Sequence, residues 1–337
     1  MRVIVTGATG NVGTSTMRSL AADPRVDSIV GLARRAPSAR ASEFDGAEKI
    51  SWRALDLEAD VLDVFAGADA VVHLAWKIQP QRDPSELTRT NILGTQRVID
   101  AVVLHRVPSL VYASSIGTYA PGPKNPRIDE TWPATGIPSS IYSRHKAEVE
   151  AMLDETERLH PDLRVVRLRT SLVFQRAAAS EVHRLFLGSL APWHIPRPLR
   201  LIPGVDRLVF QATHSDDIAD AYRRAVTEHV SGAFNIAAEP VLTPATIARA
   251  VGGRVVPMGS RVLRTAAAAT YALHLQPSEP GWIDMALQTP LMDTERARRE
   301  LGWSAAITAT DALRELLDGM GAGDGGDTRP LHPRRAS

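Results

Sequence analysis

Short apolar runs alternate with helical patterns through the first half of the chain. A strand covered on both faces of a parallel sheet is apolar throughout, so runs rich in Val, Ile and Ala predict buried strands. These runs occupy residues 3–5, 28–32, 52–57, 70–75, 109–113 and 163–168. Apolar residues three and four apart predict helices over 14–22, 85–105 and 141–159. The alternation predicts the α/β fold class, as a Rossmann-type doubly wound parallel sheet with right-handed crossovers.

Beyond residue 170 the alternation loosens, and prolines break up the stretch after Phe186. We expect residues 1–170, joined by returning segments near 205–240, to form the Rossmann domain. Residues 171–318 are expected to form mainly a smaller C-terminal lobe. In that lobe, Thr243 and Pro244 predict the cap and the first residue of a helix.

Two segments near the C-terminus have unusual compositions. Residues 262–275 are Ala-rich and predict a helix packed against the core or a substrate pocket. Residues 319–337 are Gly-rich and then rich in Pro and Arg, with few apolar positions. We therefore expect residues 319–337 to be a disordered tail.

The composition excludes several classes of function. The 337 residues are 44% hydrophobic and 23% charged with a net charge of +1, which gives no reason to expect nucleic acid or a membrane as a partner. The chain has no cysteine, so disulfides, thiolate catalysis and cysteine-ligated zinc are excluded. His183, His194 and His214 lack partners at ligand spacing, and we expect no metal. Segment 262–275 contains Arg264 and is too short to span a bilayer, and no signal peptide precedes the first strand, so the expected location is cytoplasmic.

A glycine-rich turn at residues 6–13 follows the first strand directly and leads into the first helix. Gly7 permits a tight turn, Gly10 lets the backbone approach a diphosphate, and Gly13 lets helix pack on strand. The free amide groups and the positive dipole at the helix N-terminus favour an anion. The turn therefore predicts a dinucleotide site.

The end of the second strand bears on which dinucleotide is bound. An acid at that position binds the ribose hydroxyls of NAD, whereas arginine accommodates the 2′-phosphate of NADP. Ala33 occupies the place of the acid and is followed by Arg34 and Arg35. The sequence favours NADP over NAD, with two solvated arginines as the alternative interpretation.

Tyr142 and Lys146 lie one helical turn apart on the predicted helix 141–159. On the same helix face, the ammonium of Lys146 can lower the pKa of Tyr142, which can then exchange a proton with a carbonyl or alcohol oxygen. Ser115 follows the fifth strand and can hydrogen-bond the same oxygen. Trp76, at the exit of the fourth strand, would line this pocket or cap the core.

These motifs together resemble the extended short-chain dehydrogenase/reductase family, also called the NAD-dependent epimerase/dehydratase family, over residues 1 to about 318. Matching segments lie at 6–13, 56–57, 73–75, 91–95, 114–119, 142–146, 169–174, 214–219 and 297–303. The resemblance implies that Ser115, Tyr142 and Lys146 are catalytic. It implies a small-molecule substrate and a homodimer through helices 85–105 and 141–159.

The cofactor and substrate residues follow from the motifs and the resemblance combined. The expected cofactor-binding residues are Gly7, Thr9, Gly10, Asn11, Val12, Gly13, Arg34, Arg35, Asp56, Leu57, Leu74, Ala75, Asn91, Tyr142 and Lys146. The expected substrate-binding residues are Trp76, Ser115, Arg169 and Ser171. Asp56 could equally cap the segment that begins near Ala59.

The sequence says less about which activity within this family the chain has. The resembled dehydratases place an Asp-Glu pair after the catalytic hydroxyl, where this chain has Ile116 and Gly117, so that activity is not expected. The Asn and Arg that hold a nucleotide diphosphate in the resembled epimerases are replaced near Ser171 and Phe210. Phe186, Trp193, Phe210 and Trp282 are possible walls of a less polar pocket.

We therefore expect an NAD(P)-dependent oxidoreductase acting on a secondary alcohol or ketone of a small, non-nucleotide substrate. A sugar-nucleotide epimerase with tightly bound NAD is the second hypothesis, and a non-catalytic cofactor-binding sensor is the third.

Overall fold

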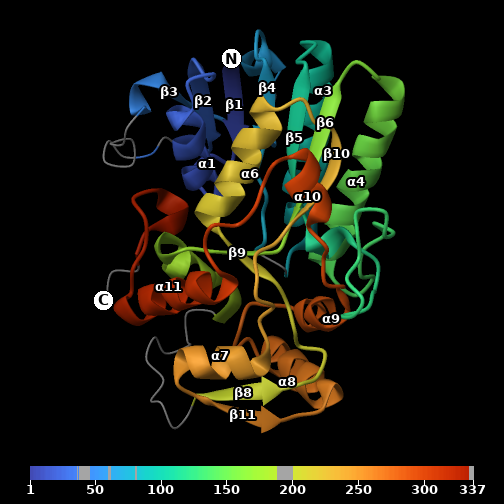
Figure 1. Ribbon diagram of the computed structural model, residues 1–337, viewed down its shortest axis with the longest axis vertical. Helices are drawn as coiled ribbons and strands as arrows, with labels where there is room; N and C mark the ends of the chain where they lie inside the picture. The colour runs from blue at the N-terminus through green and yellow to red at the C-terminus, as the bar shows by residue number, and fades with distance from the viewer. Residues whose placement is uncertain (36, 38–45, 60–61, 80–81, 188–199, 334–337) are drawn as a thin grey trace.

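The computed structural model describes residues 1–35, 37, 46–59, 62–79, 82–187 and 200–333 (Figure 1). Its main element is a seven-stranded parallel sheet with the strand order β10-β6-β5-β4-β1-β2-β3. The strands are β1 Arg2–Thr6, β2 Ser28–Ala33, β3 Ile50–Ala54, β4 Ala70–His73, β5 Ser109–Ser115, β6 Arg164–Thr170 and β10 Gly232–Ile236. The order reverses between β1 and β4, as in a doubly wound fold. The predicted α/β fold class is confirmed.

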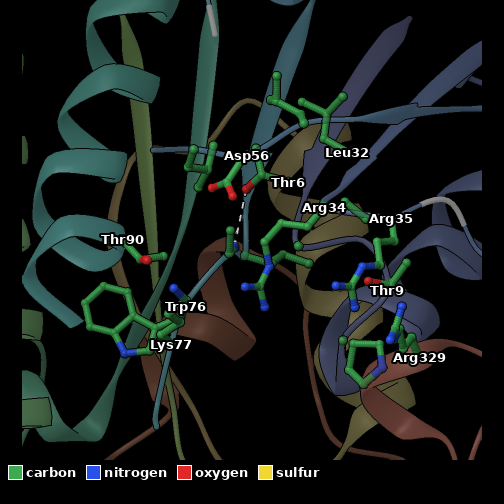
Figure 2. A pocket seen from close by; sticks show the side chains of 18 residues that line it. Thr6, Thr9, Leu32, Arg34, Arg35, Asp56, Trp76, Lys77, Thr90 and Arg329 are labelled. Atoms are coloured by element: carbon green, nitrogen blue, oxygen red, sulfur yellow. Dashed lines mark hydrogen bonds between the residues drawn. The ribbon is translucent and has the colours of Figure 1, made fainter. Parts of the chain in front are cut away.

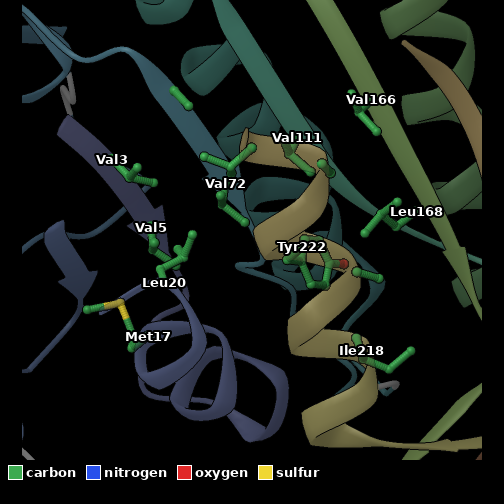
Figure 3. Packing of buried hydrophobic residues seen from close by; sticks show 14 of the residues in the cluster. Val3, Val5, Met17, Leu20, Val72, Val111, Val166, Leu168, Ile218 and Tyr222 are labelled. Atoms are coloured by element: carbon green, nitrogen blue, oxygen red, sulfur yellow. The ribbon is translucent and has the colours of Figure 1, made fainter. Parts of the chain in front are cut away.

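Helices cover both faces of the sheet. Helices α1 Asn11–Ala22 and α6 Ser215–Thr227 pack on one face of the sheet. There, Met17, Leu20, Ile218 and Tyr222 contact the strand side chains that point to that face (Figure 3). Helices α3 Gly94–Leu104 and α4 Ile141–Leu159 pack on the other face with Val98, Val102, Val149 and Leu153. Along β1, Val3 and Val5 face the first layer and Ile4 faces the second, because successive strand residues point to opposite faces. This two-sided burial is the reason that the central strands β1, β2 and β4 are mostly apolar, whereas the edge strand β3 is largely exposed.

The predicted helix 85–105 consists of three consecutive helical pieces. They are α2 Pro84–Thr88, a π-helical turn at Arg89–Leu93, and α3. Gly94 opens α3 where its backbone passes close to Leu57; a Cβ there would lie 3.1 Å from the Leu57 Cβ. The π-helical turn therefore directly precedes the point where the helix passes close to the loop after β3.

The C-terminal lobe contains two small parallel sheets, β7 Leu172–Phe174 with β9 Ala212–His214 and β8 Leu201–Gly204 with β11 Arg254–Pro257. The longer helices are α7 Pro244–Val251, α8 Ser260–Ala272, α9 Gly281–Gln288, α10 Glu295–Glu300 and α11 Ala309–Ala322, and the short helix α5 covers Ala179–Val182. The predicted start of α7 is confirmed, since Thr243 Oγ1 accepts from the Thr246 amide at 3.1 Å. Helix α10 and Trp303 return to the Rossmann core beside α6, so not all of the residues after 240 belong to the lobe.

Two expectations for the C-terminal half are corrected. Helix α8 does not pack against the core, since none of its residues is buried and Val262 is 60% exposed; its residues Ser260, Arg261 and Arg264 instead line a second cavity. The tail expected to be disordered is structured as far as residue 333, with Leu331 only 1% exposed. Gly325 permits this packing, because a Cβ there would lie 2.3 Å from the Leu331 carbonyl oxygen. Residues 334–337 lie outside the described part of the chain.

Among the residues that the structure describes, no helix has the length and apolarity needed to cross a membrane.

Candidate active site

A cavity of about 590 Å³ opens at the carboxyl ends of β1, β2 and β4 (Figure 2). This is the point where the strand order reverses, and ligands of doubly wound folds bind at that point. The lining residues expected from the sequence are Gly7, Thr9, Gly10, Arg34, Arg35, Asp56, Leu57, Leu74, Ala75 and Trp76. The sequence reasoning did not assign Thr6, Leu32, Ala33, Leu55, Lys77, Thr90, Arg329 and Pro330 to the site.

The glycine turn has the geometry that a bound diphosphate requires. Gly7 has φ of +68°, and a Cβ there would lie 2.6 Å from the Ala75 amide nitrogen. A Cβ on Gly13 would lie 2.2 Å from the Gly7 carbonyl oxygen, so α1 can pack here only without a side chain. Gly10 is the N-cap of α1, so no capping side chain accepts a hydrogen bond from the first amide groups of the helix. The first turn of α1 also contains no acidic residue. The first amide groups of α1 therefore stay available to an anion, and the residues fit a dinucleotide.

Asn11, Val12 and Gly13 belong to the glycine turn but do not line the cavity. The side-chain Nδ2 of Asn11 donates to the Val173 carbonyl at 3.1 Å, and the side-chain Oδ1 of Asn11 accepts from Gln175 Nε2 at 2.7 Å. Asn11 thus ties the turn to the C-terminal lobe through its side chain. Any contact of these three residues with a cofactor would be through the backbone at the N-terminus of α1.

The adenosine end of the cavity is positively charged. Arg34 and Arg35 follow β2, and Arg329 comes from the C-terminal segment; Figure 2 shows Arg35 and Arg329 near Thr9, with Arg34 between them and Lys77. Asp56 is the one carboxylate among the lining residues of the described chain, and its Oδ1 accepts from the Glu58 amide at 3.1 Å. Asp56 therefore makes a local turn as well as lining the cavity.

Two buried contacts fix the strand ends beside the cavity. His73 lies between the hydroxyls of Thr6, 2.7 Å from Nδ1, and Thr95, 2.9 Å from Nε2. Burial, with a smaller contribution from the Lys146 charge, lowers the pKa of His73 to about 3, so the ring is neutral. Asn91 does not line the cavity; its side chain exchanges two 2.8 Å hydrogen bonds with the Lys77 backbone. Asn91 thereby positions the chain that leaves β4.

The three residues expected to be catalytic come together at the carboxyl end of β5. Ser115 is the last residue of β5, and its Oγ accepts from the Gly117 amide at 3.0 Å. Tyr142 stands in the first turn of α4, beside Gly117, where a Cβ would meet the Tyr142 ring at 2.9 Å. Burial raises the pKa of Tyr142, and the nearby Ser115 side chain opposes that rise. Ser115 and Tyr142 can thus bind one substrate oxygen together.

Lys146 does not reach the Tyr142 hydroxyl. Its Nζ donates to the Ala113 carbonyl at 2.6 Å and lies 3.5 Å from the centre of the Trp76 ring. Burial lowers the pKa of Lys146 well below its usual value. The expectation that Lys146 lowers the pKa of Tyr142 is therefore not met in this structure, because the burial of Tyr142 dominates.

Aromatic rings surround Tyr142. The Trp282 ring of α9 lies 5.0 Å from the Tyr142 ring, and Phe186 packs edge-on against Trp282 at 5.1 Å. Trp76 completes the group at 6.0 Å from Tyr142. Phe210 is elsewhere, in an apolar cluster with Ala212 and Leu242, and Trp193 lies outside the described residues. Two of the expected aromatics, Trp76 and Trp282, thus meet Tyr142, and Phe186 extends the group through Trp282.

Arg169 and Ser171 are corrections to the expected substrate residues. Arg169 is buried and donates to both Glu150 oxygens at 2.9 Å and to the Tyr119 hydroxyl at 3.1 Å. Ser171 shares a 2.7 Å hydrogen bond with Thr213. Neither lines the cavity, because Arg169 neutralises the buried carboxylate of α4 and Ser171 joins β7 to β9.

No cluster of metal-binding side chains occurs among the described residues. His214 caps α6 by accepting from the Asp216 amide at 3.1 Å. The Asp217 carboxylate accepts from the amides of Ala306 and Ile307. His194 lies outside the described residues.

Comparisons with known proteins agree with this geometry. A model of the NAD dependent epimerase/dehydratase family matches residues 3–237. An uncharacterized protein of Mycobacterium tuberculosis is 29% identical over 326 residues, which are 94% of this chain; the chain spans only 30% of that relative. A 4-hydroxy-2-methyl-3-oxo-4-farnesyl-3,4-dihydroquinoline-1-oxide ketoreductase of Stigmatella aurantiaca is 29% identical over 153 residues, 45% of each chain.

Among solved structures, a UDP-glucose 4-epimerase of Stenotrophomonas maltophila with bound NAD and formylated UDP-arabinopyranose has a TM-score of 0.72. It shares 20% sequence identity, and the alignment covers 96% of this chain and 98% of that chain. At this level of identity the likeness shows the fold.

Proposed function

Because the chain belongs to the NAD dependent epimerase/dehydratase family, we propose that it is an NADP-dependent oxidoreductase for a small, non-nucleotide secondary alcohol or ketone. The observation that carries the proposal is the meeting of Ser115 and Tyr142 at the end of β5, inside a ring of aromatic side chains. These two hydroxyls form a proton-transfer site next to the dinucleotide cavity. Site and cavity meet at Trp76, which borders both.

The roles of the side chains follow from their contacts. A nicotinamide cofactor bound in the cavity supplies or accepts the hydride. Tyr142 gives its hydroxyl proton to the ketone oxygen in the reducing direction and takes it back in the oxidising direction. Ser115 donates a hydrogen bond to the same oxygen, and the raised pKa of Tyr142 keeps it protonated for reduction at neutral pH. Lys146 holds the Ala113 carbonyl and Trp76, and we propose that it contacts the ribose of the cofactor.

The cofactor preference rests on charge. An acid at the end of β2 would favour NAD, and Ala33 ends β2 here. Arg34 and Arg35 are exposed at the cavity and, among the described residues, make no ion pair. Two free guanidinium groups favour the additional phosphate of NADP over the ribose hydroxyls of NAD.

The substrate class rests on the aromatic wall of Trp76, Trp282 and Phe186. Such a wall favours an apolar molecule with a carbonyl group over a charged nucleotide. The partial likeness to a ketoreductase of Stigmatella aurantiaca supports the same class.

A sugar-nucleotide epimerase remains the second candidate, and one feature favours it. A second cavity of about 500 Å³ is lined by Arg207, Arg261 and Arg264, which suit a diphosphate. Helix α9 connects the site around Tyr142 with the second cavity, because its Trp282 lies next to Tyr142 and its Asp284 lines the second cavity. An epimerase would keep NAD bound tightly through purification, which separates it from the first candidate.

Cofactor identity is therefore the first experiment. The protein is denatured to test for released NAD, then titrated with NADPH and NADH, and a panel of ketones is assayed with NADPH. We expect no released NAD, tighter binding of NADPH, a loss of that preference in Arg34→Asp, and turnover of an apolar ketone. Stoichiometric released NAD would contradict the proposal and favour the epimerase.

The Tyr142→Phe variant separates an enzyme from a cofactor-binding sensor. We expect its kcat to fall by about 10²–10⁴-fold with unchanged NADPH affinity, since only the proton donor is removed. Binding of NADPH without turnover of any ketone by the wild type would favour the sensor.

We also propose a homodimer through α3 and α4, which lie side by side on one face of the sheet (Figure 1). Leu104 at the end of α3 and Leu159 at the end of α4 are 61% and 55% exposed. Light scattering after gel filtration tests this proposal, and a double change of these leucines to Glu is expected to give monomers. A wild-type monomer at micromolar concentration would contradict it.

A further inference from the structure

The C-terminal segment, residues 324–333, folds back over the glycine turn. The Thr328 hydroxyl donates to the Thr9 carbonyl at 2.7 Å, and Thr328 is only 3% exposed. The two residues are 319 positions apart in sequence, so this contact is made only in the folded chain. Arg329 and Pro330 come next and line the cavity.

Several independent contacts hold this segment in place. The Asp324 carbonyl accepts from the Ser180 hydroxyl at 2.7 Å and from its amide at 3.2 Å. Arg184 donates to the carbonyls of Pro330 and His332. Leu331 is buried, and its carbonyl accepts from the Gly326 amide at 2.8 Å. The residues before and after Arg329 in the sequence are therefore both held by hydrogen bonds, and they fix the position of its backbone.

The guanidinium group of Arg329 has no carboxylate partner among the described residues, although acidic residues are close in sequence. Asp324 pairs with Arg176 at 2.5 Å. Arg34 and Arg35, which line the same cavity, make no ion pair with any described residue either (Figure 2). By contrast, Lys77 across the cavity is neutralised by Glu58 at 3.1 Å and Glu86 at 3.0 Å.

Three unneutralised arginines thus line one cavity, and their guanidinium groups can form an anion site separate from the backbone amides of α1. Like charges held together in this way repel one another, and a dianionic group relieves that repulsion. The diphosphate is accounted for by Gly10 and the N-terminus of α1. The remaining anionic group of NADP is the phosphate on the adenosine ribose.

We propose that Arg329 is a specificity-determining residue that binds the 2′-phosphate of NADP together with Arg34 and Arg35, and that Thr328 positions it. This inference rests on the proposed NADP preference. It adds that the C-terminal segment is part of the cofactor site, so that part of the selectivity comes from outside the Rossmann domain.

The test is a binding comparison on the full chain with four probes: NADPH, NADH, 2′,5′-ADP and AMP. Arg329→Gln is expected to weaken NADPH and 2′,5′-ADP by about tenfold or more, the effect of a lost charge-assisted hydrogen bond, and to leave NADH and AMP within about twofold. Arg314→Gln removes the same charge from the exposed side of α11 and should change none of the four affinities. Thr328→Val should weaken NADPH in the same selective manner while the Tm of the protein stays close to that of the wild type.

The failures of the two proposals are distinguishable. Wild-type protein that binds NADPH no tighter than NADH overturns the NADP preference and this inference with it. A wild type that prefers NADPH, with the preference unchanged in Arg329→Gln, overturns only the role of Arg329. An equal loss of NADPH and NADH in that variant assigns Arg329 to the diphosphate and also overturns the inference. Absence of ketone turnover with the selective binding loss intact leaves the inference standing and removes only the reductase proposal.

Discussion

The ammonium nitrogen of Lys146 lies 3.5 Å from the centre of the Trp76 indole ring. Trp76 lines the cavity, whereas Lys146 is not among the lining residues. This cation–π contact replaces the Lys–Tyr contact that the sequence suggested. Through Lys146, Trp76 is in contact with the proposed catalytic group of residues.

Replacing Trp76 tests that relationship. Trp76→Leu removes the aromatic face, and a cation–π contact contributes about 0.5–2 kcal/mol, so kcat/KM with NADPH should fall by about two- to thirtyfold. Trp76→Phe keeps an aromatic face and is the matched control, with a smaller loss. Equal losses in the two variants would show that ring volume matters rather than its π face.

The buried pair of Glu150 and Arg169 should be important for stability. Glu150→Gln leaves Arg169 and Arg167 without their buried counter-charge, and breaking a buried ion pair in this way costs about 3–5 kcal/mol. Urea denaturation measures the free energy of unfolding. Asp154→Asn is the control, because Asp154 also pairs with Arg167 but is 70% exposed, and its loss should cost less than about 1 kcal/mol. Equal costs at the two positions would contradict this assignment.

His73 makes the stability depend on pH. Its pKa is lowered to about 3 in the folded protein by burial, whereas in the unfolded chain it is about 6.5. The unfolded state therefore binds the extra proton below about pH 6.5, and the free energy of unfolding should fall by up to about 1.4 kcal/mol per pH unit as the pH decreases toward 4. In His73→Asn this part of the slope should disappear, while His160→Asn, an exposed change, should keep it. An unchanged slope in His73→Asn would show that other groups dominate.

Gly13 should be needed for folding, whereas Gly10 should be needed for cofactor binding. A Cβ on Gly13 would collide with the Gly7 carbonyl at 2.2 Å, so Gly13→Ala should lower the Tm and the yield of folded protein. The nearest atom to a Cβ on Gly10 is 3.5 Å away, so Gly10→Ala should fold normally. Its NADPH affinity should nevertheless fall by about tenfold or more, because the backbone can no longer approach the diphosphate. Normal binding by Gly10→Ala would move the diphosphate away from this turn.

The sequence alone determined those features that depend on local periodicity and local turns. The apolar runs in the first half of the chain predicted six of the seven parallel strands. The glycine spacing located the cavity, and the spacing of Tyr142 and Lys146 located α4, the helix that carries both residues. Such signals lie within one strand, turn or helix, where backbone geometry depends on neighbouring residues.

Only the tertiary structure decided which charges remain available. Arg169 looked like a substrate residue, yet Glu150, 19 positions away on α4, takes up its guanidinium group. Lys146 and Tyr142 share a helix, yet burial sets the pKa of both, and Trp76 from β4's exit contacts the ammonium. The C-terminal segment has the composition of a disordered tail, yet Thr328 and Leu331 hold Arg329 at the cavity. Long-range packing and burial act between residues far apart in the sequence, and local patterns carry no record of them.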